Sequence, residues 1–327
     1  MKDLSAFDRL KLAHLPTPLH RLANISQHTG KNVYIKRDDM TGVALGGNKV
    51  RKLEYLLADA LAQGCDTVLT TGGAQSNHAM LTAACCNRLG LSCILVLKKW
   101  GVWEKKGNQL LDDLLGADVR FVDTDSYGDV YAEMDRICRM LRQQGRKPYC
   151  VPVGGSVPLG SLGYVRCMEE TASQAAALGI RFDDIICCAG SGGTMAGVVL
   201  GAMLYAPQSR VTGIVIDPDD FASIVSRLVN EAAALLEREI RLAPEDIHLH
   251  NCYGAGYAIP SAAGVRAMRL MAEQEGLILD PVYTGKTFAG LLELCAQGYF
   301  DGRDNILFLH SGGSGGLFAI DIDHPQE

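Results

Sequence analysis

The sequence predicts an α/β protein in which open, twisted, mostly parallel sheets are covered by helices. Short apolar runs alternate with helix-length segments, such as 130–144 and 261–275, whose apolar residues recur every three or four positions. The runs are apolar throughout, which is typical of parallel strands buried on both faces. The strand-like runs are residues 32–38, 67–71, 93–97, 118–123, 149–153, 184–189, 211–216 and 305–310.

Composition narrows the class of protein. The chain has 327 residues, of which 48% are hydrophobic and 21% are charged, as in an ordinary soluble globular protein. A net charge of −6 argues against general binding to nucleic acid or acidic membranes. Apolar runs such as 198–204 are far shorter than the roughly 20 residues that a membrane span needs.

The N-terminal stretch and the cysteines indicate a cytoplasmic protein. Asp3 and Asp8 lie near the start, and no apolar core of a signal peptide follows them. The 11 cysteines are scattered and odd in number, which favours reduced thiols over disulfides. The two Cys-Cys pairs lack the spacing of metal ligands, so we predict no metal site.

Ligands of such folds bind where parallel strands end. Three loops that follow predicted strands are rich in glycine and small polar residues. They are TGGAQSNH (71–78), AGSGGTMAG (189–197) and HSGGSGG (310–316).

The loop AGSGGTMAG suits an anion such as phosphate, because its glycines and the following helix N-terminus expose backbone N–H groups. It lacks the dinucleotide-binding pattern, since Met195 stands where the third glycine should be. It also lacks the GK[ST] of a P-loop. A ribose partner at Asp217 and a purely structural tight turn both stay open.

The loop TGGAQSNH places several polar groups at one helix start. Ser76 is a suitable N-cap. Gln75, Asn77 and His78 add donors and acceptors that suit a carboxylate. A helix cap without a ligand is the simpler alternative.

The loop HSGGSGG and two tyrosine loops add groups for a flat ligand. Gly312 leaves room for a ring beside Ser311. Tyr257 and Tyr283 lie in loops bounded by glycine and proline, and a tyrosine there can stack on a ring or transfer a proton. Packing alone would also explain either tyrosine.

The stretch GGNKVRKLEYL (46–56) begins a helix in an unusual way. Asn48 can cap it, yet Lys49, Arg51 and Lys52 crowd its first turn. The helix dipole already presents positive charge at that end. We therefore expect an anion among these cations.

Together the motifs resemble the pyridoxal-phosphate enzymes of the tryptophan-synthase-β-like fold, fold type II, in the D-cysteine desulfhydrase and aminocyclopropane-carboxylate (ACC) deaminase family. The resemblance implies pyridoxal 5'-phosphate in a cleft between two sheet lobes. The larger lobe would comprise residues 1–49 and 161–327, the smaller one 50–160, and a homodimer follows by analogy. The matching stretches are 13–22, 34–42, 46–54, 75–79, 152–164, 190–197, 254–260, 279–286 and 310–313.

The resemblance also implies how the cofactor is held. Lys49 would bind its aldehyde carbon, with a pKa lowered by burial, Arg51 and Lys52. Lys52 would reach the phosphate. Asn77 would bond the phenolic oxygen, while Tyr283 would stack on the ring and Ser311 would face the pyridine nitrogen. The backbone of the phosphate loop would be that of Ser191, Gly192, Gly193 and Thr194.

For the substrate, the resemblance implies a carboxylate site at Ser76, with Gln75 and His78 beside it. Lys49 would remove the α-proton, with help from Ser76. Tyr257 or Tyr283 would protonate the leaving group.

The branch of the family is predicted from one position. Thr284 stands where we expect a glutamate in deaminases, which disfavours ACC deaminase and favours D-cysteine desulfhydrase, a β-elimination lyase that releases sulfide, pyruvate and ammonia. A cysteate sulfo-lyase is the alternative, because KKWGVWEKKGN (98–108) carries four lysines that would suit a doubly anionic substrate. A solvated loop explains the same stretch. A nucleotide-dependent oxidoreductase and a non-catalytic ligand-binding protein are the rivals from other classes.

Overall fold

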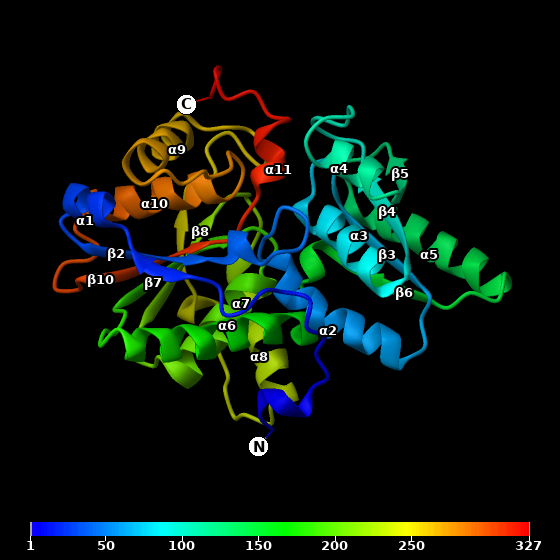
Figure 1. The fold of residues 1–327 in the computed structure, drawn as a ribbon, viewed down its shortest axis with the longest axis horizontal. Coiled ribbons are helices and arrows are strands. Elements are labelled where there is room, and N and C mark those ends of the chain that lie inside the picture. Colours follow the sequence, from blue (N-terminus) through cyan, green and yellow to red (C-terminus); the bar gives the residue numbers. More distant parts are fainter. Residues whose placement is uncertain (1, 327) are drawn as a thin grey trace.

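The computed structural model describes residues 2–326 and has two α/β lobes (Figure 1). The larger lobe contains a six-stranded sheet in the order β1-β2-β10-β7-β8-β9. Its strands are parallel except β1, which runs antiparallel to β2. The strands are β1 (Leu19–Arg21), β2 (Asn32–Arg37), β7 (Asp184–Ala189), β8 (Arg210–Val215), β9 (His248–Asn251) and β10 (Asn305–His310).

The smaller lobe contains a four-stranded sheet in the order β5-β4-β3-β6, and every pairing in it is parallel. Its helices surround this sheet on the right of Figure 1. The elements are β3 (Thr67–Gly73), α3 (Asn77–Leu89), β4 (Ser92–Lys98), α4 (Asn108–Leu114), β5 (Asp118–Val122), α5 (Tyr127–Gln143) and β6 (Pro148–Val151).

Helices cover both faces of the larger sheet (Figure 1). Side chains of neighbouring strand residues alternate between two cores: Ile185 belongs to the core under α6, α7 and α8, whereas Ile186 belongs to the core under α1, α9 and α10. This explains the continuous apolar strands. The helices are α1 (Ala23–Thr29), α6 (Pro158–Ala177), α7 (Gly193–Tyr205), α8 (Phe221–Leu235), α9 (Ala262–Glu275), α10 (Thr284–Ala296) and α11 (Ser314–Leu317), with short 3-10 turns η1 (Leu4–Ala6), η2 (Asp38–Met40), η3 (Val153–Gly155) and η4 (Pro244–Asp246).

Helix α2 (Lys49–Ala62) connects the lobes. Its Tyr55 packs in the core of the larger lobe, whereas Leu53 and Leu57 pack in a core of the smaller lobe. The N-terminus of α2 is therefore fixed where the two lobes meet. The boundaries at residues 49/50 and 160/161 stay a prediction.

The eight predicted strands all coincide with strands of the structure, and 130–144 and 261–275 coincide with α5 and α9. The short edge strands β1 and β9 were missed because LHR and HLHN have no apolar run and are mostly solvent-accessible. In residues 2–326 no helix is long and apolar enough to cross a membrane.

One predicted cap is confirmed and one is wrong. The Ser76 hydroxyl accepts the N–H of Ala79 at the start of α3. Asn48 does not cap α2, since its own backbone is helical (φ −57°, ψ −25°). Its side chain instead donates to the Thr194 hydroxyl at 2.9 Å and accepts from Lys49 at 3.0 Å.

Candidate active site

A cavity of about 190 Å³ lies where the strands of both sheets end, and all three glycine-rich loops contribute to it. It joins residues that lie more than 250 positions apart in the sequence. The predicted site residues that line it are Lys49, Ser76, Asn77, His78, Ser191, Gly192, Thr194, Tyr257, Tyr283 and Ser311. Three other predicted site residues do not line the cavity, namely Lys52, Gln75 and Gly193.

Lys49 begins α2 and reaches the cavity. Its Nζ donates to Asn48 Oδ1 at 3.0 Å. Burial lowers the pKa of Lys49 to about 8, although Cys188 and Asp280 act in the opposite direction. Burial is the main cause of the lowering, and the expected repulsion between Lys49 and Lys52 is seen in the lowered pKa of Lys52. At pH 7 about a tenth of the Lys49 amines is therefore neutral, far more than for a lysine of ordinary pKa.

Lys52 lies one turn further along α2 and is fully buried. Its Nζ donates to the Gly154 carbonyl at 2.9 Å and to the Ser156 hydroxyl at 3.4 Å. Burial, and then the charge of Lys49, hold the pKa of Lys52 well below its usual range. Within residues 2–326 no carboxylate forms an ion pair with Lys52, so its positive charge lacks a counter-ion from that part of the chain.

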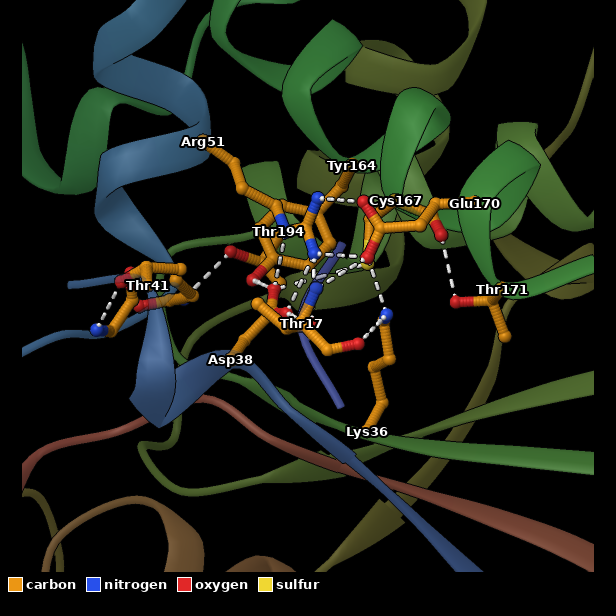
Figure 2. A network of polar contacts seen from close by, with 12 residues as sticks. Thr17, Lys36, Asp38, Thr41, Arg51, Tyr164, Cys167, Glu170, Thr171 and Thr194 are labelled. Carbon is orange, nitrogen blue, oxygen red and sulfur yellow. Dashed lines mark hydrogen bonds and ion pairs between the residues drawn. The ribbon is translucent and has the colours of Figure 1, made fainter. Parts of the chain in front are cut away.

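Arg51, the third cation, points away from the cavity into a buried ion-pair network (Figure 2). Its guanidinium donates to both oxygens of Asp38 at 2.7 and 2.9 Å. It also donates to both oxygens of Glu170 at 3.0 Å. Lys36 pairs with Glu170 as well. Two cations and two carboxylates balance one another, so the anion beside Arg51 comes from the protein.

The loop before α7 has the build of a phosphate cradle. Gly192 has a φ of +82°, which favours glycine, and α7 presents its N-terminus directly after it. The Gly193 N–H donates to the Ser156 hydroxyl at 3.2 Å. A Cβ on Gly193 would lie 2.7 Å from Lys52 Nζ, so the loop sits against this cation. Backbone donors and two unmatched cations thus fit the phosphate of the implied cofactor.

Asn77 and Ser311 line the cavity together with Lys49. Asn77 Oδ1 accepts from Asn108 Nδ2 at 2.8 Å, which turns the amide N–H groups of Asn77 outward as donors. A phenolate oxygen needs such a donor. The Ser311 carbonyl accepts the Asn48 N–H at 2.9 Å and fixes the last glycine-rich loop against α2.

Ser76 and His78 line the cavity at the N-terminus of α3, where backbone N–H groups favour a carboxylate. The ring of His78 bonds Thr70 Oγ1 at 2.8 Å. Burial, followed by the charges of Lys49 and Lys52, holds the pKa of His78 well below its usual range, so the ring is neutral. It supplies a polar wall and no positive charge.

Gln75 lies outside the cavity wall. Its Nε2 donates to the carbonyls of Val102 and Lys106 at 3.0 and 3.1 Å, and its Oε1 accepts the Asn108 N–H at 2.8 Å. The Gln75 side chain thus connects the segment 98–108 to the loop 71–78 by hydrogen bonds. To bind substrate as predicted, Gln75 would have to leave these partners.

Tyr257 and Tyr283 face each other across the cavity wall, with their hydroxyl oxygens 2.5 Å apart. Their rings meet edge to face at a centroid distance of 6.0 Å. Burial raises the pKa of Tyr257 to about 12 and that of Tyr283 well above its usual range. Both phenols therefore stay protonated at neutral pH and can donate protons.

Several cavity residues were not predicted from the sequence: Tyr127, Cys188 and Asp219 line the wall. Asp217 was considered only as a ribose partner, and Lys98 only as one of the four lysines of the segment 98–108. Lys98 ends β4, and Asp217 follows β8 by two residues. Their place at the ends of parallel strands is the signal that could have found them. Asn108 had no such signal, because only tertiary contacts bring it to Asn77.

A buried lysine of lowered pKa, a second unmatched cation and a phosphate cradle, set between two parallel sheets, define an enzyme of the fold type II pyridoxal-phosphate class. The chain belongs to the family described as pyridoxal-phosphate dependent enzyme, whose model matches residues 10–312. Pyridoxal phosphate is its cofactor, as the resemblance implied.

Relatives along the whole chain carry two names. A D-cysteine desulfhydrase of Yersinia pestis is 41% identical over 333 residues, covering 99% of this chain and 98% of the relative. A protein of Pyrococcus horikoshii, provisionally named 1-aminocyclopropane-1-carboxylate deaminase, is 42% identical over 317 residues, covering 96% and 94%. The crystal structure of an ACC deaminase homologue superposes with a TM-score of 0.90 at 42% identity, over 96% of this chain and 94% of the other.

Proposed function

We propose that the protein is a β-elimination lyase that converts D-cysteine to pyruvate, sulfide and ammonia. The observation that carries this proposal is the environment of Thr284. Its buried hydroxyl donates to Asp280 Oδ1 at 2.7 Å and accepts the Asp280 N–H at 2.8 Å. The residue after Tyr283 therefore brings no carboxylate to the cavity, which disfavours opening of a cyclopropane ring.

The geometry supports the following roles for the residues of the cavity. The cofactor, when bound, supplies the electron sink that stabilises negative charge at the α-carbon. Lys49, neutral in part, takes the α-proton. The start of α3 with Ser76 holds the substrate carboxylate. The protonated Tyr257–Tyr283 pair delivers a proton to the departing sulfur.

Cysteate is the second candidate substrate, because Lys98 lines the cavity and could face a sulfonate. The other three lysines of the segment 98–108 are exposed, and Lys105 pairs with Asp113. Asp217 and Asp219 line the cavity as well, and two carboxylates oppose a doubly anionic substrate. The charges therefore favour D-cysteine.

Three other expectations remain proposals. Size-exclusion chromatography with light scattering tests the homodimer. Limited proteolysis tests the division into residues 50–160 and the remainder. Fractionation of the producing cells tests the cytoplasmic location.

Turnover of five compounds tests the function. We expect the loaded enzyme to release sulfide and pyruvate in equal amounts from D-cysteine, and to act at least about tenfold less efficiently on L-cysteine, D-cysteate, L-cysteate and ACC, a difference of about 1.4 kcal/mol in transition-state binding. Release of 2-oxobutyrate from ACC, or of sulfite from cysteate, as the main activity would overturn the proposal.

The variant Lys49→Ala controls for the cofactor assignment. We expect it to lack the visible absorbance of bound pyridoxal phosphate and to lose about 10³-fold or more of kcat, since it lacks the amine that binds the aldehyde and takes the proton. A wild-type protein that stays colourless with added pyridoxal phosphate would contradict the assignment.

A further inference from the structure

The loop that carries Tyr257 has an unusual backbone. Between β9 and α9 the chain takes positive φ values at Gly254 (+61°), Gly256 (+133°) and Ala258 (+61°). An alanine in this region of φ costs free energy, which the surrounding structure must offset. Contacts outside the loop therefore hold it in this shape.

The strongest of these contacts comes from Lys286, which is fully buried in the first turn of α10. Its Nζ donates to the Tyr253 carbonyl at 2.7 Å and to the Gly256 carbonyl at 2.7 Å. One ammonium group thus joins two points of the loop. Among the described residues no carboxylate forms an ion pair with Lys286, so its charge is stabilised mainly by backbone carbonyls.

The loop places Tyr257 between the two lobes. From the larger lobe, Tyr283 contacts its hydroxyl. From the segment after β4, Trp100 stacks on its ring at a centroid distance of 6.4 Å and an interplanar angle of 19°. A Cβ on Gly73, at the end of β3, would lie 3.6 Å from the same ring. A shift of the loop would therefore disturb the contacts of Tyr257 with Tyr283 and Trp100.

Tyr283 and Lys286 are three residues apart at the start of α10 and hold the loop at its side chain and at its backbone. We propose that Lys286 is a positioning residue that fixes residues 253–258 so that Tyr257 stays between Tyr283 and Trp100 at the wall of the cavity. The geometric part stands on these contacts, and only its effect on turnover rests on the proposed function.

Tryptophan emission tests the geometric part without cofactor or substrate. Trp100 and Trp103 are the two tryptophans of the chain, so Trp103→Phe leaves Trp100 as the sole emitter. In this background, Lys286→Met keeps the bulk of the side chain and removes the donor. Trp100 is already 44% exposed, so we expect its acrylamide quenching constant to rise at most about twofold, because the ring of Tyr257 no longer covers one of its faces.

Lys31→Met is the matched control. Lys31 also donates to a backbone carbonyl, that of Phe300 at 2.8 Å, and is largely covered, but its partner lies outside the loop. We expect it to leave the quenching unchanged. Unchanged quenching in a folded Lys286→Met protein would overturn the proposal. If that variant fails to fold, Lys286→Ala in the same background also removes the donor, and quenching equal to that of the Trp103→Phe parent would overturn the proposal too.

Turnover of D-cysteine tests the consequence for chemistry. In Lys286→Met we expect kcat to fall at least about tenfold with KM changed less than threefold, because the proton donor moves while the carboxylate site at α3 stays in place. Lys286→Gln should recover part of the loss. Equal falls in Lys286→Met and Lys31→Met would overturn a positioning role. If the wild-type protein is inactive on D-cysteine but Lys286→Met still raises the quenching of Trp100, only the proposed function is refuted.

Discussion

The first turn of α2 has two sides, and they treat buried positive charge in opposite ways. Arg51 lies among Asp38 and Glu170, and its guanidinium is satisfied by protein carboxylates (Figure 2). Lys49 and Lys52, on the side toward the cavity, have neutral hydrogen-bond partners. At α2 the cation with protein counter-ions holds the fold together, whereas Lys49 and Lys52, which lack such counter-ions within residues 2–326 and lie at the cavity and the phosphate loop, fit a ligand anion.

The pKa values of the two sides show the same contrast. Burial by itself lowers the pKa of any of these cations. At Arg51 burial is the largest single effect, but the charges of Asp38 and Cys167 and the hydrogen bonds to Asp38 and Glu170 together outweigh it, and the pKa of Arg51 is raised well above the usual range. At Lys52 nothing opposes burial, the charge of Lys49 adds to it, and the pKa is held well below the usual range. A bound anion would stabilise the charged form of Lys52 and raise its pKa again.

Arg51 lies on what we call the balanced side of α2, where protein carboxylates match the cation. Removing Arg51 should have the largest effect on the free energy of unfolding. Arg51→Met leaves the carboxylates of Asp38 and Glu170 buried with less compensation. We expect the free energy of unfolding to fall by about 3–5 kcal/mol, as when one partner of a buried ion pair is lost. Urea unfolding of the cofactor-free protein measures it.

An exposed ion pair gives the control for this variant. Arg227 pairs with Glu231 on the surface of α8, with 58% and 42% of the side chains exposed. Arg227→Met should change stability by about 0.5 kcal/mol or less. Equal effects of the two variants would show that the buried network is not the anchor of α2.

Lys49 and Lys52 lie on the unbalanced side of α2, where no carboxylate of residues 2–326 matches the cations. Removing Lys52 should therefore affect the free energy of unfolding in the opposite direction. Without a ligand, Lys52→Met relieves a buried unmatched charge, and we expect the free energy of unfolding to stay the same or rise. Affinity for pyridoxal phosphate should fall about 10- to 100-fold, which corresponds to about 1.4–2.7 kcal/mol for a lost charge-assisted bond to phosphate. Titration of the visible absorbance measures it.

Inorganic phosphate separates the two roles of Lys52. It should raise the melting temperature of the cofactor-free wild type and leave that of Lys52→Met unchanged, because only the wild type presents the cation to the anion. A loss of stability in Lys52→Met as large as in Arg51→Met would mean that both sides of α2 are structural.

The sequence predicts the unbalanced side better than the balanced one. Lys49 and Ser76 belong to short motifs at strand ends, where parallel topology gathers them whatever the rest of the chain does. Arg51 depends on Asp38, 13 residues away, and on Glu170, 119 residues away. Nothing local marks such partners, and Arg51 was therefore left without a ligand.

Side-chain direction explains why the predicted cap at Asn48 is wrong and why Gln75 lies outside the cavity wall. Asn48 stands at the position of a cap, but the demands of Thr194 and Lys49 outweigh the local preference of asparagine for capping. Gln75 lies in the loop 71–78, yet its side-chain amide is already hydrogen-bonded to the segment 98–108. Local sequence specifies where a backbone lies, while competition among distant polar groups decides where an amide points.

The rate at which the protein binds pyridoxal phosphate should depend on pH. This dependence tests the side of α2 that carries Lys49 and Lys52. If Lys49 binds the aldehyde as proposed, it reacts only as the neutral amine, and its pKa is lowered to about 8. From pH 7 to pH 9 the neutral fraction, and with it the rate at which the visible absorbance appears, should rise about tenfold and then level off. Free Nα-acetyl-lysine, with an ordinary pKa, should show a rise that continues beyond pH 10.

The same lowering fixes the sign of the effect on stability. Between about pH 8 and 10.5 the unfolded lysine keeps its proton, whereas the folded one has lost it. Unfolding then takes up a proton, so the stability of the cofactor-free protein rises with pH across this window and is lost again as pH falls through 8. Lys49→Ala should remove this rise. A capture rate that still climbs beyond pH 10 would show that Lys49 has an anionic partner in the folded chain, and the contrast between the two sides of α2 would then fail.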